Sequence, residues 1–345
     1  MKTAREWGLM PEGLLKPGPD NAITDVAGVS VGQHSLRGEG LFTGVTAIIP
    51  HQHDIFRHKP RAAVEIINGF GKSVGLMQVA ELGMIETPIL LTNTFGVAAC
   101  SEVLIRRAIS ANPGIGRNTS TVNALVCECN DGSINDIQAL GVTPADAITA
   151  LDAARTGPVE QGSVGAGTGM TAFGFKAGIG TASRRVSIEG RDFTLGTLVL
   201  ANFGAAGDLV LPDGRRPNPC GQTGPERGSI IVVMATDLPL GNRQLQRVAR
   251  RGGAGLARLG SFWGHGSGDV VLCFTSADPV EHNPPTAFTQ QVRLCDDAID
   301  IAFRAAAETT QEAVLNSLCM ATAMAGRNGN TFPALSDWLK ENRLQ

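Results

Sequence analysis

Short apolar runs rich in β-branched residues alternate along the chain with stretches whose apolar positions repeat at helical spacing. We predict strands where such a run is short and bounded by turn residues, and helices where the pattern continues. In the first half, the predicted strands are residues 43–49, 63–67, 88–94 and 121–128, and the predicted helices are 95–111 and a helix that begins at Pro144, capped by Thr143. This alternation predicts a mixed α and β protein.

The second half of the chain continues the pattern. Its predicted elements are a glycine-rich passage at 162–180, strands at 185–188 and 193–201 joined by a hairpin, a basic amphipathic helix at 241–259, a buried strand at 269–276, and helical residues at 292–324 that form one helix or two. No internal repeat and no domain boundary stands out. The chain is therefore interpreted as a single domain.

One junction differs in kind from the others. Residues 211–228 are rich in proline and glycine and are predicted to form an exposed loop. Ser229 follows at once and opens the largely apolar run 229–236, which is typical of a strand buried on both faces. A loop accessible to processing therefore leads directly into a core strand that begins with serine.

A Gly-Ser pair before a strand is most often only structural, but this pair suits self-cleavage. Gly228 has no side chain to hinder attack on its carbonyl by the Ser229 hydroxyl. Cleavage would leave Ser229 with a free α-amine, whose ordinary pKa of about 7.7–8.0 allows it to act as a general base near neutral pH. Ser229 is the candidate nucleophile, and the bond between Gly228 and Ser229 is the candidate cleavage site.

Composition narrows the class of protein. Of the 345 residues, 43% are hydrophobic and 18% are charged, which excludes a disordered chain, and the net charge of −3 argues against nucleic acid or an anionic membrane as the main partner. The N-terminal residues lack the unbroken apolar run of a secretion signal. Seven scattered cysteines fit reduced core thiols, so a cytoplasmic location is expected.

Neither a metal nor another cofactor is expected. Cys127 and Cys129 are too close in sequence for the usual zinc spacing. His51, His53 and His58 could chelate an ion, although a solvated loop is the favoured interpretation of that segment. The chain contains no tyrosine, which removes a phenol from any catalytic scheme.

Several ordered stretches resemble the self-processing hydrolases of the β-aminopeptidase and D-aminopeptidase/esterase family. These stretches are residues 19–32, 43–46, 67–71, 86–94, 128–132, 165–170, 201–202, 228–237 and 266–269. The resemblance implies a four-layer αββα sandwich, also found in ornithine acetyltransferases. It further implies a single catalytic domain that is cut into chains 1–228 and 229–345, which stay together and assemble into a homo-oligomer of processed heterodimers.

The resemblance also implies roles for individual residues. Ser229 matches the nucleophile, and Asn202 matches the donor that stabilises the oxyanion. Ser267 and Asp269 match a serine and an acidic residue that orient the nucleophile, although relatives carry the longer Glu at the acidic position. Glu128 matches the acidic residue that holds the substrate's ammonium group. Taken singly, Asn202, Ser267 and Asp269 could be ordinary turn or loop residues, and Glu128 could be plain surface charge.

The expected activity is hydrolysis of N-terminal β-amino acids or small α-amino acids from peptides, amides and esters, through an acyl-enzyme on Ser229. Two alternatives remain open at this point. One is an acyltransferase of the ornithine acetyltransferase type, although those enzymes use Thr at the cleavage point. The other is a ligand-binding relative that has lost the chemistry.

Overall fold

The computed structural model describes residues 1–11, 13, 15–219, 226, 228–327 and 329–342. Its strands are β1 (Ser30–Gly38), β2 (Leu41–Ile49), β3 (His58–Gly69), β4 (Ile89–Asn93), β5 (Leu125–Cys129), β6 (Thr171–Ala172), β7 (Phe175–Lys176), β8 (Ile179–Ile188), β9 (Arg191–Asn202), β10 (Ser229–Thr236), β11 (Gly268–Glu281), β12 (Met324–Ala325) and β13 (Thr331–Phe332). Its α-helices are α1 (Leu76–Leu82), α2 (Val97–Ala111), α3 (Pro144–Asp152), α4 (Asn242–Ala257), α5 (Asp300–Cys319) and α6 (Leu335–Glu341).

Most of the strands in the described part of the chain belong to two large sheets. One sheet has the strand order β1-β2-β4-β5, and the other has the order β3-β11-β10-β9-β8. The pairs β4/β5 and β10/β11 are parallel, and the other neighbours in these sheets are antiparallel. Strand β10 lies in the middle of its sheet, as its apolar run predicts, and every one of its residues is buried.

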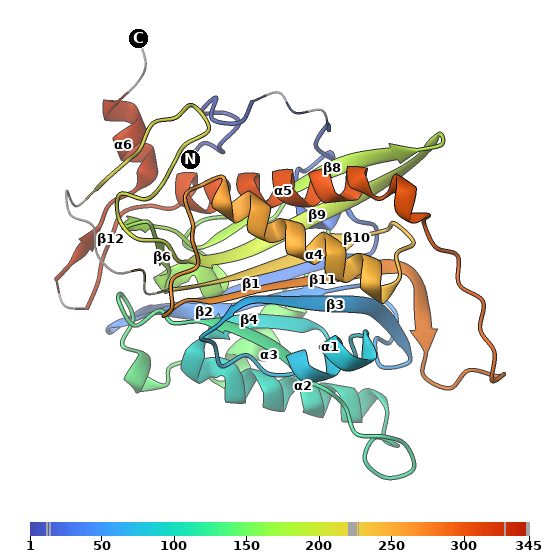
Figure 1. Cartoon of the computed structure of the whole chain (residues 1–345). Coiled ribbons are helices and arrows are strands. Elements are labelled where there is room, and N and C mark those ends of the chain that lie inside the picture. Colours follow the sequence, from blue (N-terminus) through green and yellow to red (C-terminus); the bar gives the residue numbers. More distant parts are fainter. Residues whose placement is uncertain (12, 14, 220–225, 227, 328, 343–345) are drawn as a thin grey trace.

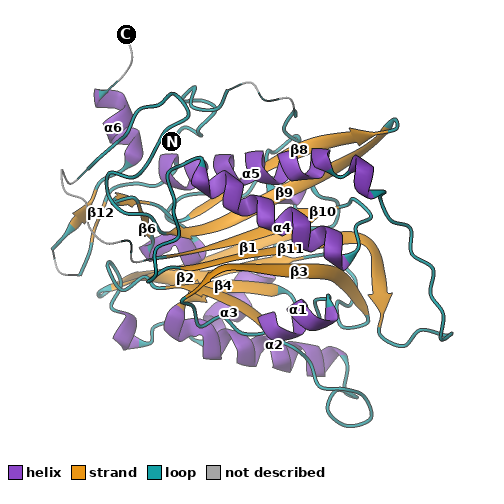
Figure 2. Cartoon of the chain, viewed as in Figure 1, coloured by secondary structure: helices purple, strands orange, loops and turns teal. Residues whose placement is uncertain are grey.

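The sheets and helices form four layers, with an apolar core between each layer and the next. Helices α4 and α5 pack on the outer face of the β10 sheet, and α2 and α3 pack on the outer face of the other sheet (Figure 1). The inner faces of the two sheets meet in a third core, which contains Ile231, Val233 and Cys129. Figure 2 shows the strands running side by side between the two helical layers. The predicted four-layer αββα sandwich is confirmed.

The predicted hairpin between the strands of the second half is present. Strands β8 and β9 are joined where Ile188 pairs with Arg191. Glu189 and Gly190, the two residues between them, have φ angles of +50° and +77°. Both central residues have positive φ, as a two-residue type I′ turn requires.

Other predictions needed correction. The helical pattern at 292–324 gives one α-helix, which begins only at Asp300, after a short 3-10 turn η5 (Asp296–Ala298). The run 121–128 forms a strand only from Leu125. Strand β1 and helices α1 and α6 have no counterpart among the predicted elements, because their short or polar sequences carry little periodicity.

A buried network of charges ties the N-terminal segment and β8 to α5. Arg184 is almost fully buried and pairs with Glu308 at 2.9 Å and with Glu312 at 2.8 Å. Arg5 binds the carboxylate of Glu312 through two hydrogen bonds of 2.6 and 2.8 Å. Each buried charge is thus balanced by an opposite charge, which burial requires.

No helix in the ranges listed above is both long and apolar enough to cross a lipid bilayer.

Candidate active site

Ser229 is the first residue of β10, and its neighbours across the sheet are fixed by register. Ser229 pairs with Asn202 at the end of β9 and with Gly268 at the start of β11. Because directly opposed residues of a sheet project their side chains to the same face, the Asn202 amide lies beside the Ser229 hydroxyl. The structure therefore brings together residues that are 27 and 39 positions apart in sequence.

The Ser229 hydroxyl faces the bond that would be cut. Its Oγ donates a hydrogen bond of 2.7 Å to the carbonyl oxygen of Gly228. The backbone N–H of Gly268 points at the same place, 3.1 Å from the Gly228 oxygen and 3.2 Å from Ser229 Oγ. The candidate nucleophile and a hydrogen-bond donor thus both contact the carbonyl oxygen of Gly228.

The side-chain amide of Asn202 is held in one orientation. Its Oδ1 accepts a hydrogen bond of 3.1 Å from the Thr171 N–H, and its Nδ2 donates one of 2.9 Å to the Asn130 carbonyl oxygen. An amide nitrogen carries two hydrogens, so one remains for a further acceptor. Asn202 can therefore donate to an oxyanion that forms beside Ser229.

Ser267 and Asp269 lie on either side of Gly268 and contact each other. Ser267 Oγ donates a hydrogen bond of 2.7 Å to Asp269 Oδ1, and both residues are fully buried. Burial raises the pKa of the Asp269 carboxyl from its ordinary 3.8 to about 6; the nearby charge of Glu226 adds to the rise, and the hydrogen bond from Ser267 opposes it. Ser267, just before β11, and Asp269, within it, thus form an organised polar pair next to the candidate nucleophile.

The raised pKa of Asp269 predicts a pH-dependent cost to stability. Between pH 3.8 and about 6, the folded chain holds a proton that the unfolded chain has released, so stability falls as pH rises through this window. We expect Asp269→Asn, which can still accept from Ser267, to stabilise the fold at pH 7 by about 1–3 kcal/mol.

Urea unfolding at pH 7 and at pH 4, in a Ser229→Ala background that is expected to stay uncut, measures this effect. The gain in the free energy of unfolding that Asp269→Asn gives at pH 7 should nearly vanish at pH 4. The pKa of Asp131 is also raised to about 6 by burial, and this residue is present in both proteins, so the difference isolates Asp269. An equal advantage at the two pH values would contradict the prediction.

Glu128 is not the surface charge that its sequence context allowed. It is 3% exposed, at the end of β5. One carboxylate oxygen accepts from the Lys72 N–H at 2.7 Å, and the other accepts from the Thr94 hydroxyl. Among the residues that the structure describes, Glu128 forms no ion pair, so its charge is available to a cationic group.

Three of these side chains line one cavity of about 630 Å³ at this end of the sheets. Glu128 contributes to its wall from one sheet, and Asn202 and Ser229 contribute from the other. Further lining residues are Phe70, Lys72, Thr94, Asn130, His265 and Arg327. A volume of this size suits a small substrate such as a short peptide. Asp269 and Ser267 lie behind the wall rather than in it.

Two residues at the site had no role assigned to them from the sequence. Glu226 lies in the segment predicted to be an exposed loop, yet it is 7% exposed. Residues 220–225 and 227 of that segment lie outside the described residues. Cys129 donates from Sγ to the Ser229 carbonyl oxygen at 3.4 Å, which ties the two sheets together beneath the nucleophile. Glu226 belongs to no short pattern that could have drawn attention to it, and Cys129, although it lies in the resembling stretch 128–132, was interpreted only as a core thiol.

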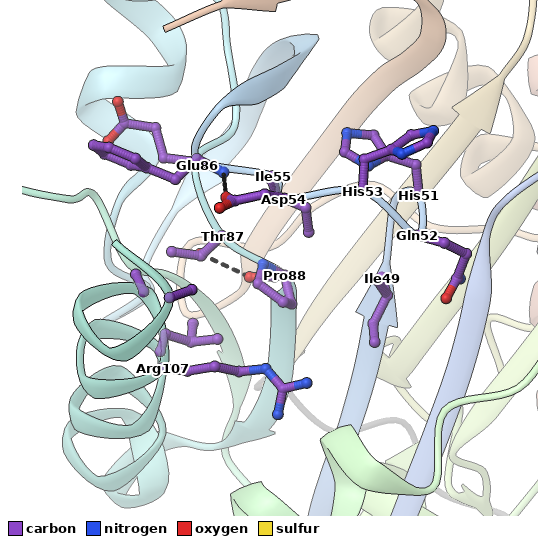
Figure 3. A pocket seen from close by; sticks show the side chains of 14 residues that line it. Ile49, His51, Gln52, His53, Asp54, Ile55, Glu86, Thr87, Pro88 and Arg107 are labelled. Atoms are coloured by element: carbon purple, nitrogen blue, oxygen red, sulfur yellow. Dashed lines mark hydrogen bonds between the residues drawn. The ribbon is translucent and has the colours of Figure 1, made fainter. Parts of the chain in front are cut away.

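Two of the three clustered histidines, His51 and His53, line a different cavity, of about 310 Å³, at the opposite end of β4 (Figure 3). His51 and His53 lie on one side of it and Arg107 of α2 on the other. The expectation of a solvated loop is wrong for His51, which is 9% exposed and hydrogen-bonded through Nε2 to the His58 carbonyl oxygen at 2.7 Å. Within the described residues, no group of three potential ligands is placed to hold a metal.

Comparisons with known proteins identify the family of this chain. A model of peptidase family S58 matches residues 21–332. The β-peptidyl aminopeptidase BapA of Sphingosinicella microcystinivorans is 37% identical, over 96% of this chain and 89% of its own length. The β-aminopeptidase of a Burkholderia species superposes with a TM-score of 0.90 at 35% identity, covering 100% of both chains. The L-aminopeptidase D-Ala-esterase/amidase of Ochrobactrum anthropi, described as a prototype of the serine aminopeptidases and a variant of the Ntn hydrolase fold, superposes with a TM-score of 0.87 at 35% identity and 99% coverage of each chain.

Proposed function

Because this chain belongs to peptidase family S58 and has an aminopeptidase function, we propose that it is a self-processing enzyme whose nucleophile is Ser229. The observation that carries the proposal is the contact of Ser229 Oγ with the Gly228 carbonyl oxygen at 2.7 Å, with the Gly268 N–H directed at the same oxygen. This contact places a hydroxyl and an oxyanion donor at one peptide bond, as attack on that bond requires.

Self-cleavage proceeds in two steps, formation of an ester and its hydrolysis. Ser229 Oγ attacks the Gly228 carbonyl carbon, the C–N bond breaks, and the Ser229 nitrogen takes up a proton while the hydroxyl loses one. The resulting ester joins Gly228 to Ser229 Oγ. Water then hydrolyses the ester, which leaves a carboxylate on Gly228 and restores the hydroxyl of Ser229, now beside a free α-amine.

Strand pairing and buried ion pairs would hold the two cut chains together. Strand β10 remains paired with β9, and the buried network joins Arg5 and Arg184 of the first chain to Glu308 and Glu312 of the second. Separation would expose these charges without partners and open the apolar cores.

Turnover uses the same groups on a substrate. The freed α-amine of Ser229 accepts the hydroxyl proton, Oγ attacks the substrate carbonyl, and the amide of Asn202 stabilises the oxyanion. The amine then passes the proton to the leaving nitrogen, and water releases the acyl group from Oγ. Ser267, just before β11, and Asp269, within it, lie on either side of Gly268 and hold the amine in place.

Glu128 restricts the reaction to the N-terminal residue of a substrate. Its buried carboxylate lines the cavity beside the nucleophile and can bind the ammonium group of an N-terminal residue. The relatives' names indicate N-terminal β-amino acids, and small α-amino acids are the second substrate class. Hydrolysis rates on matched β-alanyl, L-alanyl and D-alanyl amides decide between them; we expect the β-alanyl amide to be cut fastest, and a higher rate on either α-alanyl amide would overturn that order.

Replacing Glu128 with Gln is expected to lower kcat/KM for substrates with a free amine by about 10–100-fold. Gln keeps an oxygen for the Lys72 N–H, and its NH₂ group can donate to the Thr94 hydroxyl, so the change removes charge with little change in shape. The matched control is the N-acetylated form of each substrate, measured on both proteins. The preference for the free amine should shrink in the variant; an undiminished preference would show that Glu128 does not bind the ammonium group.

A further inference from the structure

Glu226 is a buried carboxylate three residues before the candidate nucleophile. It is 7% exposed, and each of its carboxylate oxygens accepts a backbone hydrogen bond. Oε1 accepts from the Gly204 N–H at 3.2 Å, and Oε2 accepts from the Gly264 N–H at 2.6 Å. Charge-assisted bonds of this kind are among the stronger hydrogen bonds in proteins.

The two amides that hold Glu226 belong to the loops that carry the site. Gly204 comes two residues after Asn202, and Gly264 comes three residues before Ser267. A Cβ atom at Gly264 would lie 2.9 Å from Glu226 Oε2 and 2.8 Å from Glu226 Cβ, so the loop fits closely around this side chain. Glu226 therefore joins the segment before the cut to both catalytic loops.

The position of Glu226 also restricts the scissile bond. Successive Cα atoms are 3.8 Å apart, so Gly228 can lie no farther than about 7–8 Å from a fixed Glu226. Gly228 itself packs closely, because a Cβ atom there would lie 2.1 Å from the Asn202 carbonyl oxygen. With both ends of this short segment held, the Gly228 carbonyl remains in contact with Ser229 Oγ and the Gly268 N–H.

We propose that Glu226 is a positioning residue for self-cleavage, whose carboxylate, bound by the amides of Gly204 and Gly264, holds the Gly228 carbonyl against Ser229 Oγ. This inference rests on the proposed self-processing of the chain. It adds a residue that acts before the cut, in the formation of the ester. Once the bond is cut, Gly228 must leave the place that a substrate carbonyl takes beside Ser229, so the task of Glu226 ends with the cut.

The test follows the appearance of the second chain during cell-free synthesis of the full-length protein. Glu226→Ala should lengthen the half-time of self-cleavage at least tenfold. Gly264→Ala should do the same with Glu226 still present, because its methyl group displaces the carboxylate. Gly266→Ala is the matched control, since a Cβ there meets the Glu226 carbonyl oxygen at an ordinary 3.6 Å; its half-time should stay within twofold of the wild type.

Hydroxylamine shows whether Glu226 acts on formation of the ester or on its hydrolysis, because hydroxylamine cleaves an ester but not a peptide bond. If Glu226 acts before the ester forms, hydroxylamine will not restore the rate of Glu226→Ala. Restoration to the wild-type rate would overturn the proposal, because Glu226 would then act on ester hydrolysis. Cleavage of Glu226→Ala at the wild-type rate would overturn it as well.

Folding is checked in the Ser229→Ala background. Circular dichroism and thermal unfolding of this protein, with and without Glu226→Ala or Gly264→Ala, should show folded chains. If both added changes unfold the chain, Glu226 is a structural residue and the proposal is overturned. Ser229→Ala alone also separates the two hypotheses: if that protein is still cut, self-processing by Ser229 fails, whatever the result at Glu226.

Discussion

Replacing Ser229 with Ala is expected to leave a single uncut chain and to lower hydrolysis by at least about 10³-fold. The variant loses the only atom placed against the Gly228 carbonyl as a nucleophile within the described site, Oγ at 2.7 Å. Without the cut, it also lacks the free α-amine that serves as the base in turnover. One substitution thus removes both the processing and the activity.

Ser229→Cys is the matched variant, because a thiol is a nucleophile of similar size. We expect it to be processed, if more slowly, whereas Ser229→Ala is not. Thermal unfolding should find both proteins folded, since the change involves one atom in a strand whose apolar residues pack in the cores. Processing of the alanine variant at any rate near that of the wild type would show that another residue makes the cut.

Replacing Asn202 with Ala is expected to lower kcat by about 10²–10³-fold with a small change in KM. The register of β9 and β10 sets its amide beside Ser229, where charge develops only as the tetrahedral intermediate forms. Loss of a donor used only in the transition state lowers kcat rather than substrate binding. Initial rates over a range of substrate concentrations separate the two constants.

Asn202→Asp is the control for the shape of this side chain. It keeps an oxygen for the Thr171 N–H but offers no N–H to an oxyanion. Activity as low as that of the alanine variant identifies the donor as the missing element. If Asn202→Asp were nearly as active as the wild type, neither an oxyanion donor at this position nor the bond to the Asn130 carbonyl oxygen would be needed, and Asn202 would serve only to hold the Thr171 backbone.

The parts of the fold that the sequence predicted are those with strong local patterns. The run 229–236 was predicted as a buried strand, and β10 has the same bounds because its residues are apolar and β-branched almost throughout. Strand β1 was missed because its residues, such as Gln33, His34 and Arg37, are mostly polar or small and lie at the sheet's edge. Local propensity carries little information about a strand that forms because it pairs with a neighbouring strand of the fold.

The candidate site could not be predicted from local sequence patterns, because its residues meet only through long-range contacts. Asn202 and Gly268 meet Ser229 only through the register of three strands, and the family resemblance, not the spacing, indicated Asn202. The loop before Ser229 read as exposed because of its prolines and glycines, yet Glu226 within it is buried against two backbone amides. Burial of a charged residue in such a loop follows from the whole fold.

Self-processing would make Ser229 the N-terminus of a second chain. Intact mass measurement with N-terminal sequencing of the purified protein under denaturing conditions tests it directly. We expect two chains, of which the second begins Ser-Ile-Ile-Val and the first ends at Gly228. A single intact chain in the active protein, or a second chain that begins at another residue, would contradict it.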